Sequence, residues 1–187
     1  MKVIVGLGNP GLDYDDTRHN LGWWVLDRLV YDWRFGLFER VGSGLQVDGA
    51  VGGHPVLLIK PTTFMNRSGA ALTVLREVRD FDAAQDLLVV VDDATLDVGR
   101  VRFRPKGGSG GHKGLTSVAG ALGTKEYARL RIGVGQVPLG VGLSDWVLSP
   151  MGSEDEDRVV ALLPELSRAV RAWIEKGVAE AMNQFNR

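Results

Sequence analysis

The chain of 187 residues contains no cysteine, which excludes disulfides, thiolate nucleophiles and thiolate metal ligands. Only three histidines are present, scattered at His19, His54 and His112, and this argues against a zinc site. No apolar run approaches the roughly 20 residues that cross a bilayer. The N-terminal residues also lack the apolar stretch of a signal peptide. We therefore expect a cytoplasmic protein, not inserted in a membrane, whose chemistry rests on side chains and water.

The overall composition is that of an ordinary globular domain, with 44% hydrophobic and 24% charged residues. This length supports one sizeable core and is short for two, so we predict a single domain spanning residues 1–187. The net charge of −1 argues against indiscriminate coating of nucleic acid. From Arg100 to Arg131, however, eight lysines and arginines face one acidic residue, giving a local net charge of +7. The basic charge is therefore confined to one region.

Periodicity and turn residues divide the chain into alternating strands and helices. Strands are expected at residues 2–6, 44–50, 55–60, 86–92, 100–106 and 129–135. Helices are expected at residues 20–33, 68–78, 115–122 and 154–184, the last of them interrupted by Pro164. The continuous apolar run at 87–91 predicts a strand in the centre of the sheet. This alternation fits an α/β fold.

His19 is the first candidate for chemistry, because it follows a strand and turn and directly precedes an apolar helix. An unperturbed imidazole titrates at about pH 6.5 and can act as a general base if a carboxylate orients it. Asp92 and Asp93 are the obvious carboxylates, since they end a buried strand where open α/β sheets place their ligands. A single histidine is more often structural, so this segment alone leaves the role open. His54 fits a solvated turn.

Two glycine-rich segments resemble nucleotide-binding motifs only in part. Residues 6–11 match the spacing G-x-G-x-x-G, but Pro10 lacks an amide hydrogen and Asp13 and Asp15 would repel a pyrophosphate. The loop at 107–114 lacks the G-K-[ST] ending of a phosphate-binding loop. A nucleotide-binding enzyme is therefore the weakest of the functional hypotheses. A turn that projects the amide of Asn9 beside the strand end is the better interpretation.

Two further patterns each allow two interpretations. Along residues 100–106 the cationic side chains of Arg100, Arg102, Arg104 and Lys106 share one face, which suits either a charged edge strand or a binding surface. Residues 64–66 are either a helix start with core residues or an amide donor with an aromatic face for a ligand.

Taken together, segments spread over nearly the whole chain resemble the bacterial peptidyl-tRNA hydrolase family. They read GLGNPG at 6–11 and TRHNLG at 17–22, PTTFMN-x-SG at 61–69, VVVDD at 89–93, and GG-x-GGH-x-GL at 107–115 with RLRIGVG at 129–135. The resemblance implies a single α/β domain with a mixed, twisted sheet flanked by helices on both faces. It also implies hydrolysis of the ester between a peptide and tRNA, with no metal or cofactor, by a monomer.

The same resemblance implies roles for individual residues. His19 would activate water, Asp92 would hold its ring, and Asn9 would sense whether the α-amino group is acylated. Asn66 would position water or the oxyanion. Arg104 and Arg131 would clamp tRNA phosphate, agreeing with the local charge. The remaining expected substrate contacts are Tyr14, Phe64, Met65 and His112, the last as a structural or substrate-lining residue.

The chain departs from the family pattern at two places. Lys113 stands where the family has asparagine after the glycine-loop histidine, and the segment after the strand reads DDATLD at 92–97 instead of D-x-LDLP. Because lysine accepts no hydrogen bond, we predict altered substrate affinity with the chemistry retained. A non-catalytic RNA-binding protein on the same scaffold is the alternative that this lysine favours.

Overall fold

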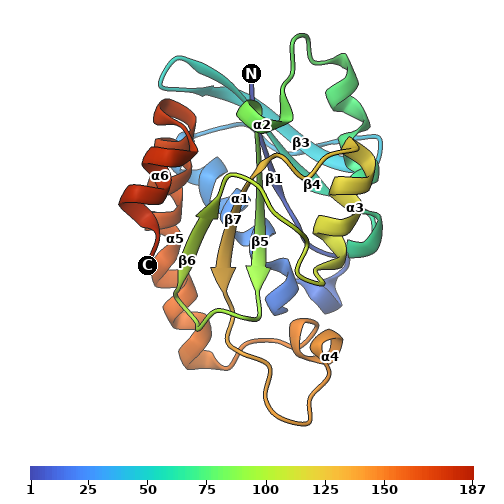
Figure 1. The fold of residues 1–187 in the computed structure, drawn as a ribbon, viewed down its shortest axis with the longest axis vertical. Helices are drawn as coiled ribbons and strands as arrows, with labels where there is room; N and C mark the ends of the chain where they lie inside the picture. Colours follow the sequence, from blue (N-terminus) through green and yellow to red (C-terminus); the bar gives the residue numbers. More distant parts are fainter.

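A seven-stranded mixed sheet with the order β2-β3-β4-β1-β5-β7-β6 forms the centre of the computed structural model, which describes residues 1–187 (Figure 1). The strands β4, β1, β5 and β7 are parallel, whereas β2, β3 and β6 pair antiparallel with their neighbours. Strand β5 is buried along its whole length, as its apolar run predicts. The strands are β1 (Lys2–Gly6), β2 (Glu39–Val41), β3 (Gly44–Val51), β4 (His54–Pro61), β5 (Leu87–Asp93), β6 (Val101–Arg104) and β7 (Ala128–Gly133).

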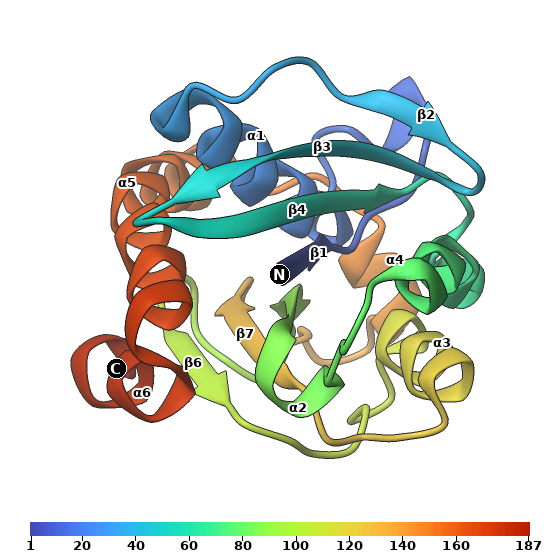
Figure 2. The ribbon, with the colours of Figure 1, turned by 90° about the horizontal axis from the view of Figure 1, so that it is seen from above.

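Helices cover both faces of this sheet and enclose two separate cores (Figures 1 and 2). Because side chains alternate along a strand, Ile4 of β1 enters one core while Val3 and Val5 enter the other. The first core packs under α1 (Leu21–Trp33), α5 (Ser153–Lys176) and α6 (Val178–Phe185). The second packs under α3 (Lys113–Leu122) and a long 3₁₀ segment, η3 (Met65–Glu77). The predicted fold class is confirmed.

The shorter elements are η1 (Leu12–Tyr14), η2 (Arg18–Asn20), α2 (Ala83–Asp86) and α4 (Leu143–Val147). Most predicted elements lie within a few residues of their observed bounds. The helix predicted at 68–78 is the 3₁₀ segment η3, and it begins earlier, at Met65. Its Gly69 lies against α3 so closely that an added Cβ would lie 2.7 Å from the Cβ of Ala121. No helix has the length and apolar character to cross a membrane.

The predicted interruption of the C-terminal helix at Pro164 is wrong. Helix α5 runs through Pro164 and ends at Gly177, where φ is +85°. The carbonyl that loses its partner at Pro164 belongs to Val160, a residue that is 51% exposed, so water can replace the missing bond. Buried Leu162 and Leu166 hold the helix against the sheet on both sides of the proline.

Strand β6 lies at one edge of the sheet, in agreement with the interpretation of residues 100–106 as a charged edge strand. The C-terminus covers the open side of this strand, and Figure 1 shows it beside β6. The backbones of Val101 and Arg187 exchange hydrogen bonds of 3.3 and 3.1 Å. The side chain of Asn186 then accepts from the amide of Phe103 and donates to its carbonyl. These bonds satisfy the edge, so its arginines are not needed to protect it.

Candidate active site

A cavity of about 850 Å³ opens at the carboxyl ends of β5 and β7. Asp92 lies at the end of β5, and His19 reaches the cavity from η2, just before α1. This is the edge of the sheet at which open α/β folds bind their ligands. Six of the predicted site residues line the cavity, namely His19, Asp92, Arg104, His112, Lys113 and Arg131.

Asp92 joins two histidines through a single carboxylate oxygen. Its Oδ1 lies 2.8 Å from Nδ1 of His19 and 2.9 Å from Nε2 of His112. The two imidazole rings are tilted, with centroids 4.8 Å apart. Burial of Asp92 alone would raise the pKa of its carboxyl, but the two imidazoles outweigh it and hold that pKa below its usual range. The carboxylate therefore stays ionised near neutral pH.

The hydrogen bonds also fix where each imidazole carries its proton. Nδ1 of His112 accepts from the backbone amides of Gly114 and Leu115 at 3.1 and 3.4 Å, which makes His112 the N-cap of α3. The proton of His112 must then lie on Nε2, facing Asp92. His19 donates from Nδ1 to the same carboxylate, and its Nε2 makes no hydrogen bond within the protein. Of the two histidines bonded to Asp92, only His19 therefore has a free basic nitrogen.

His19, Asp92 and His112 are also the one group of three potential metal donors, with ligand atoms within 4.8 Å of one another. His19 and His112 are far apart in the sequence, but η2 and the glycine-rich loop bring them together at Asp92. The arrangement nevertheless does not fit a metal ion. A metal on Nε2 of a neutral His112 would require the proton on Nδ1, where two backbone N–H groups already point.

Asn9 is held from two sides in the turn after β1. Its Oδ1 accepts from the amide of Met65 at 2.7 Å. Asn20 accepts from the backbone amide of Asn9 at 2.8 Å and donates to its carbonyl at 2.9 Å. Because Oδ1 is occupied, the side-chain NH₂ of Asn9 points away from Met65 and has no partner in the protein. Asn20 belongs to the motif at 17–22, but the sequence alone assigns it no role. Its position directly after His19 is the feature of the sequence that could have indicated one.

Arg18 is a second residue that sequence reasoning missed. Its guanidinium lies 3.5 Å from the ring centre of Trp146. One of its terminal nitrogens donates to the carbonyls of Trp146, Ser149 and Pro150. Burial lowers the pKa of this guanidinium from its ordinary value. Arg18 thereby ties η2, which carries His19, to α4, which forms an apolar wall of the cavity.

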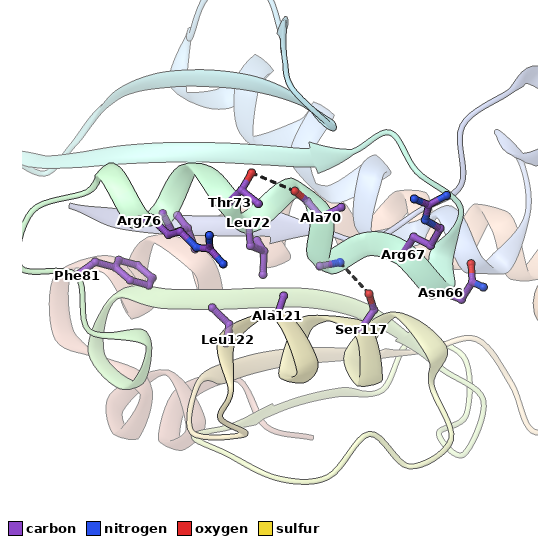
Figure 3. Close-up of a pocket in the computed structure, with 12 residues that line it drawn as sticks. Asn66, Arg67, Ala70, Leu72, Thr73, Arg76, Phe81, Ser117, Ala121 and Leu122 are labelled. Carbon is purple, nitrogen blue, oxygen red and sulfur yellow. Dashed lines mark hydrogen bonds between the residues drawn. The ribbon is translucent and has the colours of Figure 1, made fainter.

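The remaining predicted contacts lie outside the lining of this cavity. Tyr14 and Phe64 meet edge to face, with ring centroids 6.2 Å apart, and Phe64 is 58% exposed. Met65 is buried against the start of α3, where a Cβ on Gly114 would lie 2.5 Å from its Sδ. Asn66 is exposed, makes no hydrogen bond in the protein and lines a second groove (Figure 3).

The basic region is less free than the sequence count suggests. Arg131 bonds Asp93 at 2.5 Å, and Lys106 pairs with Glu126 at 3.0 Å. Arg129 is 2% exposed and donates to three backbone carbonyls of the glycine-rich loop and its neighbouring turn, those of Gly107, Gly108 and Lys125. Arg104 and Lys113 are exposed without an acidic partner. Among the cationic side chains that line the cavity, Arg104 and Lys113 are therefore the two available to a ligand.

The fold and the site define an α/β enzyme class, in which a carboxylate-oriented imidazole faces a ligand cavity with a free basic nitrogen. Comparison with known proteins gives the family. The family model described as peptidyl-tRNA hydrolase matches residues 3–187. The chain belongs to the peptidyl-tRNA hydrolase family, and the family predicted from the motifs is confirmed.

Individual relatives agree over the full length. The chain is 41% identical to the peptidyl-tRNA hydrolase of Bacillus subtilis (strain 168), with 100% of this chain and 98% of the relative covered. It is 43% identical to that of Symbiobacterium thermophilum, covering 99% and 98%. The crystal structure of peptidyl-tRNA hydrolase from Acinetobacter baumannii superposes with a TM-score of 0.91 at 31% identity, covering 100% of this chain and 94% of the other.

Proposed function

We propose that this protein hydrolyses the ester between a peptide, or an N-blocked amino acid, and tRNA, and so recycles tRNA from prematurely released peptidyl-tRNA. The observation that carries the proposal is the free Nε2 of His19, set by the bond from Nδ1 to Asp92. This nitrogen faces a cavity that also holds Arg104 and Lys113, cations suited to a phosphate-bearing ligand. Family membership supplies the substrate class.

In this mechanism Nε2 of His19 takes a proton from water as the water attacks the ester carbonyl. The imidazolium that forms lies against Asp92 at 2.8 Å, where the carboxylate stabilises the new charge. The proton then passes to the leaving ribose oxygen. An ester has a good leaving group, so a base, its carboxylate and one or two amide donors suffice without a covalent intermediate, metal or cofactor.

The asparagines fit the donor roles. The NH₂ group of Asn9 is unpaired and its orientation is fixed by Met65 and Asn20, which suits recognition of the acylated α-nitrogen. Asn66 is free to donate to water or the oxyanion. Tyr14 and Phe64 together offer an exposed aromatic edge for the tRNA end, with Met65 buried behind it. His112 fixes Asp92 and the start of α3, so its role is positioning.

Arg104 and Arg131 would contact tRNA phosphates, and contacts of this kind are independent of sequence and suit many tRNAs. We expect a monomer in the cytoplasm. The alternative, an RNA-binding protein without activity, is favoured only by Lys113, which is exposed in the cavity. The retained pair of His19 and Asp92 argues for the enzyme.

The deciding experiment is single-turnover release of an N-acetylated amino acid from tRNA by the native chain and by His19→Ala. Unblocked aminoacyl-tRNA serves as the control substrate. We expect rapid release from the blocked substrate alone, and loss of that release in the variant. Tight tRNA binding with no release by the native chain would establish the RNA-binding alternative.

A further inference from the structure

A second groove, of about 570 Å³, runs between η3 and α3, and of its lining residues only Asn66 has a role in the chemistry above (Figure 3). Its floor is apolar, with Leu72 of η3 and Ala121 and Leu122 of α3. Asn66 and Arg67 lie at one end of the groove, and Arg76 and Phe81 lie at the other.

The charged groups of this groove are all cationic and unpaired. The side chains of Arg67 and Arg76 are exposed and form no ion pair or hydrogen bond in the protein, and no acidic side chain lines the groove. Ser117 accepts from the amide of Gly69 at 2.9 Å, which leaves its own hydroxyl proton free. An apolar floor with unpaired guanidinium groups suits a chain that carries both apolar and carboxylate side chains.

The groove starts beside the reaction centre. Asn66 follows Met65, whose amide is bonded to Asn9 and whose sulfur packs against the first turn of α3. That turn begins at His112, whose ring centroid is 4.8 Å from that of His19. The exposed cations Arg104 and Lys113 lie instead in the cavity that contains His19. An ester held at His19 therefore has a cationic cavity on one side and this groove on the other.

We propose that the groove between η3 and α3 binds the peptide of the substrate, and that Arg67 and Arg76 select peptides with acidic side chains at defined distances from the ester. This inference rests on the proposed function, because it needs the ester at His19. Segment η3 spans nine residue steps from Arg67 to Arg76, or about 18 Å at the 3₁₀ rise of about 2.0 Å per residue. An extended peptide rises about 3.4 Å per residue, so the two arginines lie about five peptide residues apart. Arg67 meets residues closer to the ester.

The test measures single-turnover kcat/KM on octapeptidyl-tRNAs that carry Glu or Gln at one position, second or seventh from the ester. N-acetyl-aminoacyl-tRNA, which is too short to enter the groove, is the internal control. The native chain should prefer Glu over Gln by about three- to fivefold, the size of an exposed ion pair. Arg76→Gln should abolish this preference at the seventh position, and Arg67→Gln should abolish it at the second.

Two further variants make the outcome specific. Arg79→Gln is the matched control, because Arg79 is an exposed arginine just beyond η3 that pairs with Asp80 and does not line the groove. It should leave every preference unchanged. Arg76→Glu should convert the preference at the seventh position from Glu to Lys.

Hydrolysis of the short substrate by all of these variants without any Glu preference in the native chain would overturn the groove proposal and leave the proposed function intact. Equal losses on long and short substrates, with a weaker salt dependence of binding, would assign the two arginines to tRNA instead. Failure of the native chain on the short substrate would refute the function itself.

Discussion

The Asp92→Asn substitution removes the charge beside His19 while keeping the shape of the side chain. An asparagine Oδ1 can still accept from Nδ1 of His19 and Nε2 of His112, so both rings keep their protons in place. What disappears is the attraction between the carboxylate and the imidazolium formed during the reaction. At about 4 Å and an effective dielectric constant of about 20, this attraction is about 4 kcal/mol. The expected loss of rate is therefore about a thousandfold.

Single-turnover hydrolysis of N-acetyl-aminoacyl-tRNA at saturating enzyme isolates this rate at pH 7. Binding of the substrate, measured separately, should change little, because Asp92 is 3% exposed behind the two imidazoles. Asp93→Asn is the matched control. Its carboxylate bonds Arg131 and Thr95 and does not touch His19, so the rate at saturation should stay within a few-fold of the native value.

A loss below about tenfold in Asp92→Asn would refute the reasoning, because no significant positive charge would then develop on His19. A loss shared equally by Asp93→Asn would assign the effect to the net charge of the cavity instead of the bond to His19. A loss far above a thousandfold would mean that asparagine presents its NH₂ group to His19 and reverses the proton positions.

Four further outcomes follow from the same contacts. The pKa of Asp92 is lower in the folded state than in the unfolded chain, so its ionised carboxylate stabilises the fold above the unfolded pKa of about 3.9, and this stabilisation is lost progressively as the pH falls below that value. The difference in the free energy of unfolding between the native chain and Asp92→Asn, measured by urea unfolding, should therefore become smaller from pH 5 to pH 3. His112→Ala should lower the free energy of unfolding by about 1–2 kcal/mol through loss of the α3 cap, and His112→Asn should recover much of that loss while leaving Asp92 without its second donor. Arg104→Gln should reduce the slope of log K for tRNA against log salt by about one, with a smaller change for Arg131→Gln, whose guanidinium already bonds Asp93. Lys113→Asn should change peptidyl-tRNA affinity and leave the rate at saturation unaltered; unchanged binding would remove Lys113 from the substrate contacts.

The sequence carries the fold where a pattern is local. The apolar run of β5 predicts a strand inside the sheet, and this is found. The alternation of β6 allows a charged edge strand or a binding surface, and the structure has β6 at an edge of the sheet. The prediction at Pro164 is wrong because the free-energy cost of a proline within a helix depends on whether the carbonyl that loses its hydrogen bond can find another partner. The carbonyl of the exposed Val160 can bond to water. The pairing of the C-terminus with β6 is not predicted from the sequence, because it joins Asn186 to Phe103, which lie far apart in the chain.

For the site, sequence motifs identify the residues but not their partners. Asp92 and Asp93 are equal candidates by position, and the family resemblance favours Asp92. The structure shows Asp92 bonded to the two histidines and Asp93 bonded to Arg131. Similarly, Arg129 and Arg131 share a strand face, yet the guanidinium of Arg129 donates its hydrogen bonds to carbonyls of the glycine-rich loop. Whether a cationic side chain is available to a ligand depends on acceptors that lie far away in the sequence. The periodicity of the sequence does not indicate these acceptors.

The convergence of two histidines on Asp92 divides the work between them. His112 is bonded at both ring nitrogens, to the first amides of α3 and to Asp92, so it cannot take a proton from water without breaking the helix cap. His19 is bonded at one nitrogen only and keeps the other for the substrate. The same bonds link the glycine-rich loop to the carboxylate, because the loop ends at His112. A movement of that loop that pulls His112 away would leave Asp92 with a single donor, so the conformation of the loop and the hydrogen bonding of the carboxylate that holds His19 are coupled through one oxygen atom.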